Sequence, residues 1–323
     1  MMKEALIQNL DIKKLLSGST TFTIVDLGCS VGPNTLFAME NIIEIVENKY
    51  HSERLGSKKL EFQVFFNDLT ANDFNTLFAS LPDERKKYFA AGVPGSFFTR
   101  LFPCSSIHIA YSSSSLHWLS KLPVELQDKN SPAWNPGRIH YTGAPEAVVR
   151  AYANQFEEDM VMFLNARSQE IVGGGMIVIL MPGVPDGVLT HDVGIALTFL
   201  GSILMDMVQE GLLKQDQVDL FNFPHVYPSV KEMTRLVEKN GCFEIIKMEQ
   251  RNARTNTEAP IDIESAIMHL RAFTQESVAN HMGTQIVDQL FTKALQQKSR
   301  FSYMLYSSGI EIGVQLFSLL KRK

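Results

Sequence analysis

The sequence has few cysteines, no dense run of basic residues and no N-glycosylation motif. Its 3 cysteines, Cys29, Cys104 and Cys242, lie far apart and lack the paired spacing of zinc sites or redox pairs. Lys and Arg number 30 against 35 Asp and Glu, so there is no basic footprint for a nucleic-acid backbone. No Asn is followed two places later by Ser or Thr. These absences exclude a disulfide scaffold and argue against nucleic-acid binding and secretion.

Long apolar runs are missing as well. The longest, over residues 193–208, contains Asp206 and falls short of the ~18 apolar residues that a membrane span needs. The start of the chain, with Lys3 and Glu4, lacks the apolar core of a signal peptide. We therefore expect a cytoplasmic protein in a reducing environment, with neither a membrane nor a nucleic acid as its partner.

The chain alternates short apolar runs with helical patterns, which is typical of a mostly parallel sheet with helices on both faces. Parallel strands need long connections, and the helices supply them. The predicted strands are 23–27, 62–66, 107–111, 176–181, 243–248 and 314–320, with 89–93 as a weaker seventh. The predicted helices are 1–16, 37–50, 146–172 and one over 193–211, with two more in 264–297.

We predict one α/β domain over residues 1–323, with insertions at roughly 183–230 and 255–305. Ligands of such sheets bind at the carboxyl ends of the strands, and insertions between strands commonly cover that crevice. The insertions are therefore expected to form an α-helical cap. The alternative is that they only add packing to a sheet face.

A glycine turn follows the first predicted strand. Residues 24–35 place Asp26 at the end of an apolar run, then Gly28 and Gly32, and then a helix. The spacing is Gly-x-x-x-Gly, not the Gly-x-Gly-x-x-Gly of dinucleotide folds, and no Gly-Lys-Ser/Thr follows. Because Asp26 would repel a pyrophosphate, a nucleoside with a cationic or neutral tail fits better. An ordinary strand-to-helix turn remains the alternative.

The second predicted strand also ends in an acid, Asp68. Nucleotide-binding sheets place an acid here to accept hydrogen bonds from ribose hydroxyls, usually about 20 residues after the first glycine. Asp68 comes 40 residues after Gly28, which requires a longer first crossover. The alternative is that Asn67 and Asp68 form only a turn before a helix at Ala71.

Taken together, these segments resemble the plant SABATH carboxyl methyltransferases over nearly the whole chain. Several motifs occur in the family's order, which is far more specific than any one of them. They are 26–34, 66–69, 72–75, 92–103, 115–120 and 219–222. Residues 127–131 and 137–141 are most similar to the loganate-methylating branch.

The resemblance implies a class I methyltransferase fold, a seven-stranded sheet with an α-helical cap, that binds S-adenosylmethionine and releases S-adenosylhomocysteine. It implies that Gly28 and Asp26 lie at the cofactor. It also implies cofactor contacts from Cys29, Asn34, Asp68, Leu69, Ser96 and Phe97. Without the family pattern these residues have simpler interpretations, such as a small buried thiol for Cys29 and a core ring for Phe97.

The resemblance places the substrate at His117 and Trp118, after the polar run 111–115. In the family, the tryptophan donates its indole N–H, a donor-only group, to the substrate carboxylate. His117 would be a second donor or a wall of the pocket. Ser114 stands where many members carry a bulky aromatic residue, which implies a roomier pocket.

Some relatives hold Mg²⁺ beside the active site. Their pattern maps to Asn135, Asp219, the carbonyl of Phe221, and Asn222. Oxygen ligands suit Mg²⁺, but one carboxylate makes a weak site, so we expect an optional ion or only a turn that stabilises the cap.

The leading hypothesis is an S-adenosylmethionine-dependent O-methyltransferase that forms the methyl ester of a small plant carboxylic acid. A carboxylic acid is ionised at pH 7, so alignment of the reactants does the work and no catalytic acid or base is expected. One alternative is a nicotinamide-dependent oxidoreductase. Another is a non-catalytic homologue, because the family's N-terminal segment with its Tyr and Gln is absent ahead of the uncapped first helix. A homodimer is expected from the family.

Overall fold

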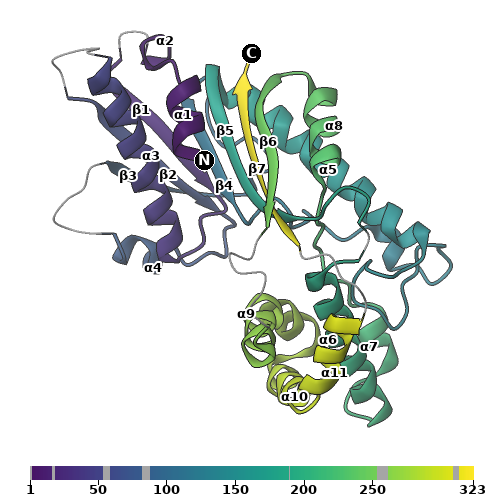
Figure 1. Cartoon of the computed structure of the whole chain (residues 1–323). Coiled ribbons are helices and arrows are strands. Elements are labelled where there is room, and N and C mark those ends of the chain that lie inside the picture. Colours follow the sequence, from purple (N-terminus) through teal and green to yellow (C-terminus); the bar gives the residue numbers. More distant parts are fainter. Residues whose placement is uncertain are drawn as a thin grey trace.

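The computed structural model describes residues 2–16, 19–53, 59–81, 88–188, 190–252, 261–307 and 313–323. Residues 255–260 of the second predicted insertion lie outside these ranges. The core of the fold is a seven-stranded sheet in the order β3-β2-β1-β4-β5-β7-β6 (Figure 1). The strands are β1 Thr21–Leu27, β2 Glu61–Asp68, β3 Phe89–Pro94, β4 Ile107–Ser113, β5 Ile171–Gly183, β6 Phe243–Asn252 and β7 Val314–Arg322.

The sheet is mostly parallel, as predicted. Strands β1 to β5 pair in parallel, whereas β7 runs antiparallel to both β5 and β6. All seven predicted strands are present, and the fold class is confirmed. The carboxyl ends of the parallel strands therefore meet at one edge of the sheet, which faces the helices at the bottom of Figure 1.

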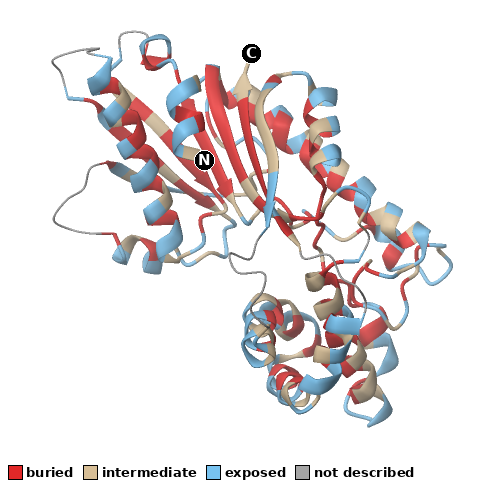
Figure 2. Ribbon diagram, viewed as in Figure 1, coloured by how far each residue is buried: buried red, intermediate tan, exposed pale blue. Residues whose placement is uncertain are grey.

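Helices cover both faces of the sheet (Figure 2). On one face lie α1 Met2–Asn9, α2 Ile12–Leu16, α3 Pro33–Ser52 and α4 Phe74–Ala79. On the other lie α5 Glu146–Glu170 and α8 Val230–Asn240. Because successive strand residues point to opposite faces, Ile24 packs in the first core cluster and its neighbour Val25 in the second.

A third apolar cluster lies below the sheet and is built mainly from helices, with Ile139, Phe221 and Phe223 added from loops (Figure 1). It contains α6 Asp192–Gln209, α7 Gln215–Asp219, α9 Ile263–Met282, α10 Thr284–Gln296 and α11 Lys298–Ser307. Figure 1 shows these helices opposite the carboxyl ends of the parallel strands. Helix α6 is long and apolar enough to span a membrane by length and composition, but Leu197, Leu200 and Leu204 bury its apolar side in this cluster.

The structure corrects several predicted helices. The helix expected over 1–16 is two, because Asp11 accepts a hydrogen bond from the Lys14 N–H (3.0 Å) and starts α2. The helix expected at Ala71 begins at Phe74, where Asp73 caps it. A short helix, η1, covers Val124–Leu126.

Helices α7, α8 and α11 lie outside the predicted set. Helix α8 has a sequence signature that could have found it: Ser229 and Glu232 form a capping box at its N-terminus.

Candidate active site

A cavity of about 710 Å³ opens at the carboxyl ends of β1, β2 and β4. All eight residues expected to contact a cofactor line it: Asp26, Gly28, Cys29, Asn34, Asp68, Leu69, Ser96 and Phe97. We refer to this space as the cofactor cavity. It also carries Ser113, Ser114 and Ser115 from the end of β4.

The glycine turn that forms one wall is fixed by close packing. Gly28 has a φ of +84°, and a Cβ built on it would lie 2.1 Å from the Ser115 Oγ, so only glycine fits. The N–H groups of Gly28 and Cys29 both donate to the carbonyl of Asn67, at 2.9 and 3.0 Å. The side chain of Asn67 in turn donates to the carbonyls of Val93 and Gly95. One residue at the end of β2 thereby joins the turn to the loop after β3.

Asp68 presents an oriented carboxylate at the end of β2. Its two oxygens accept hydrogen bonds from the N–H groups of Ser30 (2.7 Å) and Leu69 (2.8 Å). Ser30 adopts a φ of +53°, a backbone conformation that residues other than glycine rarely adopt, and this brings its N–H to Asp68. The acid is thus a built feature of the cavity and not a turn residue alone.

Asp26 is buried beneath the glycine turn and accepts a hydrogen bond from the Thr35 hydroxyl. Burial raises its pKa to about 7; the Thr35 bond opposes the rise and the charge of Asp68 adds to it. Burial beside the same two acids also raises the pKa of the Cys29 thiol, which stays protonated and is no nucleophile.

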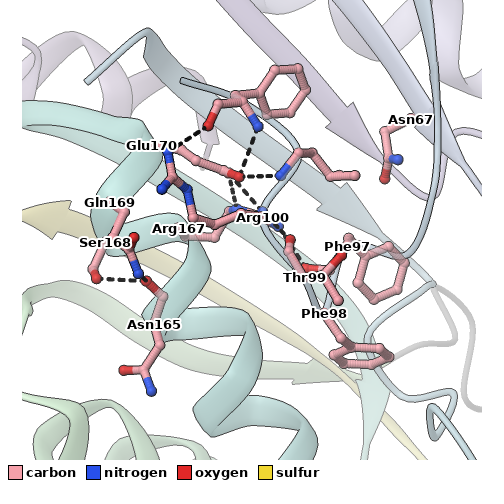
Figure 3. Close-up of polar contacts among 12 residues, drawn as sticks. Asn67, Phe97, Phe98, Thr99, Arg100, Asn165, Arg167, Ser168, Gln169 and Glu170 are labelled. Atoms are coloured by element: carbon pink, nitrogen blue, oxygen red, sulfur yellow. Dashed lines mark hydrogen bonds and ion pairs between the residues drawn. The ribbon is translucent and has the colours of Figure 1, made fainter. Parts of the chain in front are cut away.

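The loop that carries Ser96 and Phe97 is held by a buried ion pair on α5 (Figure 3). The Arg167 guanidinium pairs with Glu170 and donates to the carbonyls of Phe97 (2.7 Å) and Thr99 (3.0 Å). Glu170 accepts the N–H groups of residues 101 and 102 from the far end of the loop. This pair was not among the predicted functional residues, because the three-residue spacing on a helix is its only local signal.

Helices α6, α7, α9, α10 and α11 form the cap. A second cavity, of about 490 Å³, lies between the sheet and cap helices α6, α9 and α11. We call it the acid pocket, because the family resemblance places a carboxylic acid substrate beside His117 and Trp118, which line it. Its walls are mostly apolar, and it meets the cofactor cavity at Ser114 and Trp118, which line both. The lining residues are Ser114, His117, Trp118, Pro182, Asp192, Val193, Ala196, Tyr227, Ile261, Ala266, His269, Leu270, Phe273, Phe301 and Leu305.

His117 and Trp118 lie in a turn after β4. Segment 223–227 holds them. The Val226 N–H donates to the His117 carbonyl (2.9 Å), and Trp118 forms an isolated antiparallel bridge with His225, whose ring lies 3.5 Å from the indole ring. Segment 223–227 carried no signal in the sequence, since its role depends on a contact about 107 residues away in the chain.

His117 is buried, and burial lowers its pKa to about 3, so its imidazole is neutral at physiological pH. Its Nδ1 atom has no hydrogen-bond partner among the described residues. A buried polar atom without a partner at the wall of a cavity is free to bind a ligand there. A neutral imidazole and an indole N–H suit recognition of an anion better than proton transfer.

The four residues proposed for Mg²⁺ do lie close to one another. Asn135 donates to Asn222 (2.8 Å), and Asp219 accepts hydrogen bonds from the Gly137 N–H (2.8 Å) and from Gln215 (2.7 Å). Phe221 lies two residues after the end of α7 and is buried. The Asn135 Oδ1 lacks a partner and is free to be a ligand, but in the described part of the chain no three His, Cys, Asp or Glu side chains gather as a metal site.

The sheet order, the glycine turn and the acid that ends β2 define the class of this protein, which has a class I methyltransferase fold. Comparisons with known proteins identify the family. The family model for SAM dependent carboxyl methyltransferases matches residues 1–323. The chain therefore belongs to this family, and the resemblance to the SABATH enzymes is confirmed.

Individual relatives agree. Loganic acid O-methyltransferase of Catharanthus roseus is 45% identical over 328 residues, which cover 99% of this chain and 86% of the relative. Farnesoic acid carboxyl-O-methyltransferase of Arabidopsis thaliana is 40% identical over 292 residues, covering 90% and 82%. A solved structure of loganic acid methyltransferase with SAH has a TM-score of 0.93 at 43% identity, covering 100% of this chain and 91% of that one.

The chain is thus an S-adenosylmethionine-dependent carboxyl methyltransferase, and the main functional prediction is confirmed. The alternatives, a nicotinamide-dependent oxidoreductase and a non-catalytic homologue, find no support in these comparisons.

Proposed function

We propose that this enzyme methylates a plant monocarboxylic acid with a large apolar body, bound in the acid pocket with its carboxylate toward Trp118. The observation that carries the proposal is the junction of the two cavities at Ser114 and Trp118. An acid on one side of that junction can reach a methyl donor on the other. The apolar walls, which include Leu270, Phe273 and Phe301, suit a carbon skeleton.

In this proposal, Trp118 and His117 orient the carboxylate. The indole N–H can only donate, and His117 offers the unpartnered Nδ1 atom of a neutral ring. Segment 223–227 fixes both residues through backbone hydrogen bonds, so that the donors are held in place before the substrate arrives. Rigid placement of this kind can contribute ~7–11 kcal/mol to lowering the barrier.

The cofactor cavity suits S-adenosylmethionine by the character of its donors and acceptors. Asp68 offers oriented acceptors for ribose hydroxyls, and Asp26 offers a carboxylate that favours a cation. When bound, the cofactor supplies a methyl group on a sulfonium; the carboxylate oxygen bonds to that carbon as the carbon–sulfur electron pair returns to sulfur. No proton moves, which is why the chain needs no general base.

The test is a panel of acids assayed with labelled methyl donor, comprising loganic acid, farnesoic acid and benzoic acid, with xanthine as a substrate without a carboxyl group. Loganic and farnesoic acids are included because relatives of 45% and 40% identity are named for them. We expect methyl ester formation from one or more acids and none from xanthine. Methylation of xanthine alone would refute the proposal.

The donor role of Trp118 is tested by Trp118→Phe, which keeps the aromatic wall and removes the N–H. We expect kcat/KM to fall 10- to 100-fold, with most of the change in KM, and S-adenosylhomocysteine affinity to be unchanged. The matched control is Trp134→Phe, since Trp134 lies outside both cavities beside Lys129. Equal activity of the two variants would refute the role.

We further propose that Mg²⁺ is optional, because Asp219 is the single carboxylate among the four residues and already accepts two hydrogen bonds. If present, the ion would bind Asn135, Asp219, Asn222 and the Phe221 carbonyl and would stabilise the cap. Activity that survives EDTA within about twofold would support this, whereas loss restored by Mg²⁺ would refute it.

We also propose a homodimer, from the family resemblance, and a cytoplasmic location, supported by three cysteines that form no disulfide. Light scattering on a sizing column tests the first, and imaging of a fluorescent fusion tests the second. A monomer at micromolar concentration, or a fusion in the secretory pathway, would contradict them.

A further inference from the structure

The acid pocket contains an acid of its own. Asp192 lines it at the first residue of α6, on the sheet side of the space. Its Oδ1 accepts hydrogen bonds from the N–H groups of Val193 (2.9 Å) and Gly313 (3.0 Å). Gly313 directly precedes Val314, which pairs with Gly183 at the end of β5. The carboxylate is therefore fixed beside the sheet edge from which the substrate-binding turn also projects.

This position removes a natural anion site. The N-terminus of an α-helix, with its free N–H groups and positive dipole end, attracts carboxylates. At α6 that end opens toward the acid pocket, since Asp192 and Val193 both line it. The N-cap residue His191 accepts from the Gly194 N–H (3.3 Å) and the Asp192 carboxylate accepts from the Val193 N–H, so these two side chains occupy the helix end. A substrate carboxylate near this end of α6 is therefore repelled by the Asp192 carboxylate, instead of being attracted by the free N–H groups of the helix.

The rest of the described lining does not compensate. It includes no Lys or Arg, and His117 is a neutral donor because burial lowers its pKa. His225, which packs against Trp118 from behind, is likewise held neutral by burial, with further repulsion from His117 and His140. Tyr227 and Ser114 are uncharged. His269 on α9 is the second histidine in the described lining, and it lies on the cap side of the pocket.

We propose that Asp192 is a specificity-determining residue that makes the acid pocket repel anions, so that an acid binds tightly only while the adjoining cofactor cavity holds a positive charge. The proposal rests on the proposed function of this pocket. It follows from the shared lining at Ser114 and Trp118, which puts a cation in one cavity next to an anion in the other.

The consequence is a one-way preference. Before transfer, the carboxylate is attracted by the cofactor's sulfonium; afterwards, the ester and S-adenosylhomocysteine are both uncharged at the reacting centre. A fresh acid that meets the enzyme with S-adenosylhomocysteine still bound is repelled by Asp192. Dead-end complexes of the acid with the spent cofactor are thereby disfavoured.

The test measures binding, without turnover, by calorimetry at pH 8, where exposed imidazoles are largely neutral. Loganic acid and farnesoic acid are the probes, each with its methyl ester as the uncharged control. They are titrated into the enzyme saturated with S-adenosylhomocysteine or with sinefungin, an analogue that carries an ammonium in place of the sulfonium and transfers no methyl group. We expect the acid to bind at least tenfold tighter with sinefungin and the ester to bind equally in both.

Asp192→Asn keeps an acceptor oxygen for both N–H groups and removes the charge. We expect it to tighten acid binding at least threefold in both complexes and to leave the ester unchanged. The control is Asp186→Asn, which removes the same charge from a residue that accepts one hydrogen bond, from the Lys231 N–H, outside the acid pocket.

The outcomes separate the inference from the proposed function. Acid affinities that are equal in the two complexes, or unaffected by Asp192→Asn, would overturn the inference and leave the pocket assignment standing. A loss of acid affinity in His269→Gln, equal in both complexes, would also overturn it, because the protein would then supply the counter-charge. If neither acid binds with sinefungin, these acids are not its ligands and both proposals fail.

Discussion

The pKa of the Asp26 carboxyl depends on the charge of the ligand in the cofactor cavity. Burial of this carboxyl and repulsion by the nearby Asp68 carboxylate raise the pKa of Asp26 to about 7 in the free protein. A cationic ligand in the same cavity favours the charged carboxylate and therefore lowers that pKa. Binding must then release protons in the pH range where the free protein still holds them.

We predict that binding of sinefungin releases up to one proton near pH 6.5, and that its affinity falls as the pH is lowered through about 7. Calorimetry in buffers of different ionisation enthalpy measures the proton count. Asp26→Asn should abolish the release, whereas Asp128→Asn, an exposed acid that accepts from the Asn130 N–H, should preserve it. Binding with no proton release in the unchanged protein would show that the pKa of Asp26 is ordinary.

At the scale of elements, the loop after β3 depends on α5. Arg167 and Glu170 are both about 1% exposed, and together they bind the backbone of the loop at four points. Removing one partner of a buried ion pair leaves an uncompensated charge, which costs about 3–5 kcal/mol. The loop carries Ser96 and Phe97, so the same change reaches the cofactor cavity.

We predict that Glu170→Gln lowers the free energy of unfolding by about 3 kcal/mol and weakens S-adenosylhomocysteine binding at least fivefold. Urea unfolding and calorimetry measure the two effects. Glu157→Gln, on the same helix but at the surface with Arg235 and Lys239, should cost no more than about 1 kcal/mol and leave binding intact. If the two variants behaved alike, the ion pair would have no special role in the loop.

The contrast between strands and connections explains what the sequence could predict. Each strand of the sheet could be predicted from an apolar run in the sequence. The glycine turn could be predicted as well, because Gly28, Asp26 and Asp68 are recognisable at the ends of predicted strands. The roles of segment 223–227 and of the Arg167–Glu170 pair could not be predicted from the sequence, because each contacts backbone that lies about 70 to 110 residues away in the chain. The cofactor side of the site was therefore predictable, while the acid pocket was only partly so.

Across the whole molecule, a cluster of four buried histidines lies around Tyr227, at the loops where sheet and cap meet. The Tyr227 ring lies 4.6 Å from the ring of His191 and about 6 Å from those of His117, His140 and His225. His140 also bonds the His225 carbonyl (3.2 Å), and His191 caps α6. The cluster connects the start of helix α6 to the turn that carries His117 and Trp118.

Burial keeps all four histidines neutral: it lowers the pKa of His117 and His140 to about 3, of His191 to about 4, and of His225 well below its ordinary value. In the unfolded chain they titrate near pH 6.5. Above that pH neither state binds the protons, and stability is unaffected. Below it, the unfolded chain takes them up and the folded protein does not, so stability falls with pH. Asp26 acts oppositely, because its raised pKa favours the folded state as the pH falls from about 7.

We predict that the free energy of unfolding falls by about 4 kcal/mol per pH unit between roughly pH 6 and 4, since each unopposed histidine contributes up to ~1.4 kcal/mol per unit and Asp26 offsets one of the four. Because the free energy of unfolding of a typical protein is about 5–15 kcal/mol, we expect the protein to unfold within this pH range, with loss of the contacts between sheet and cap. Urea midpoints at half-unit pH steps measure the slope. His140→Gln should reduce the slope by about a third, since it removes one of three net contributions, while His51→Gln, exposed at the end of α3, should not change it. A midpoint that stays constant from pH 7 to 5 would show that these histidines are not held neutral in the folded protein.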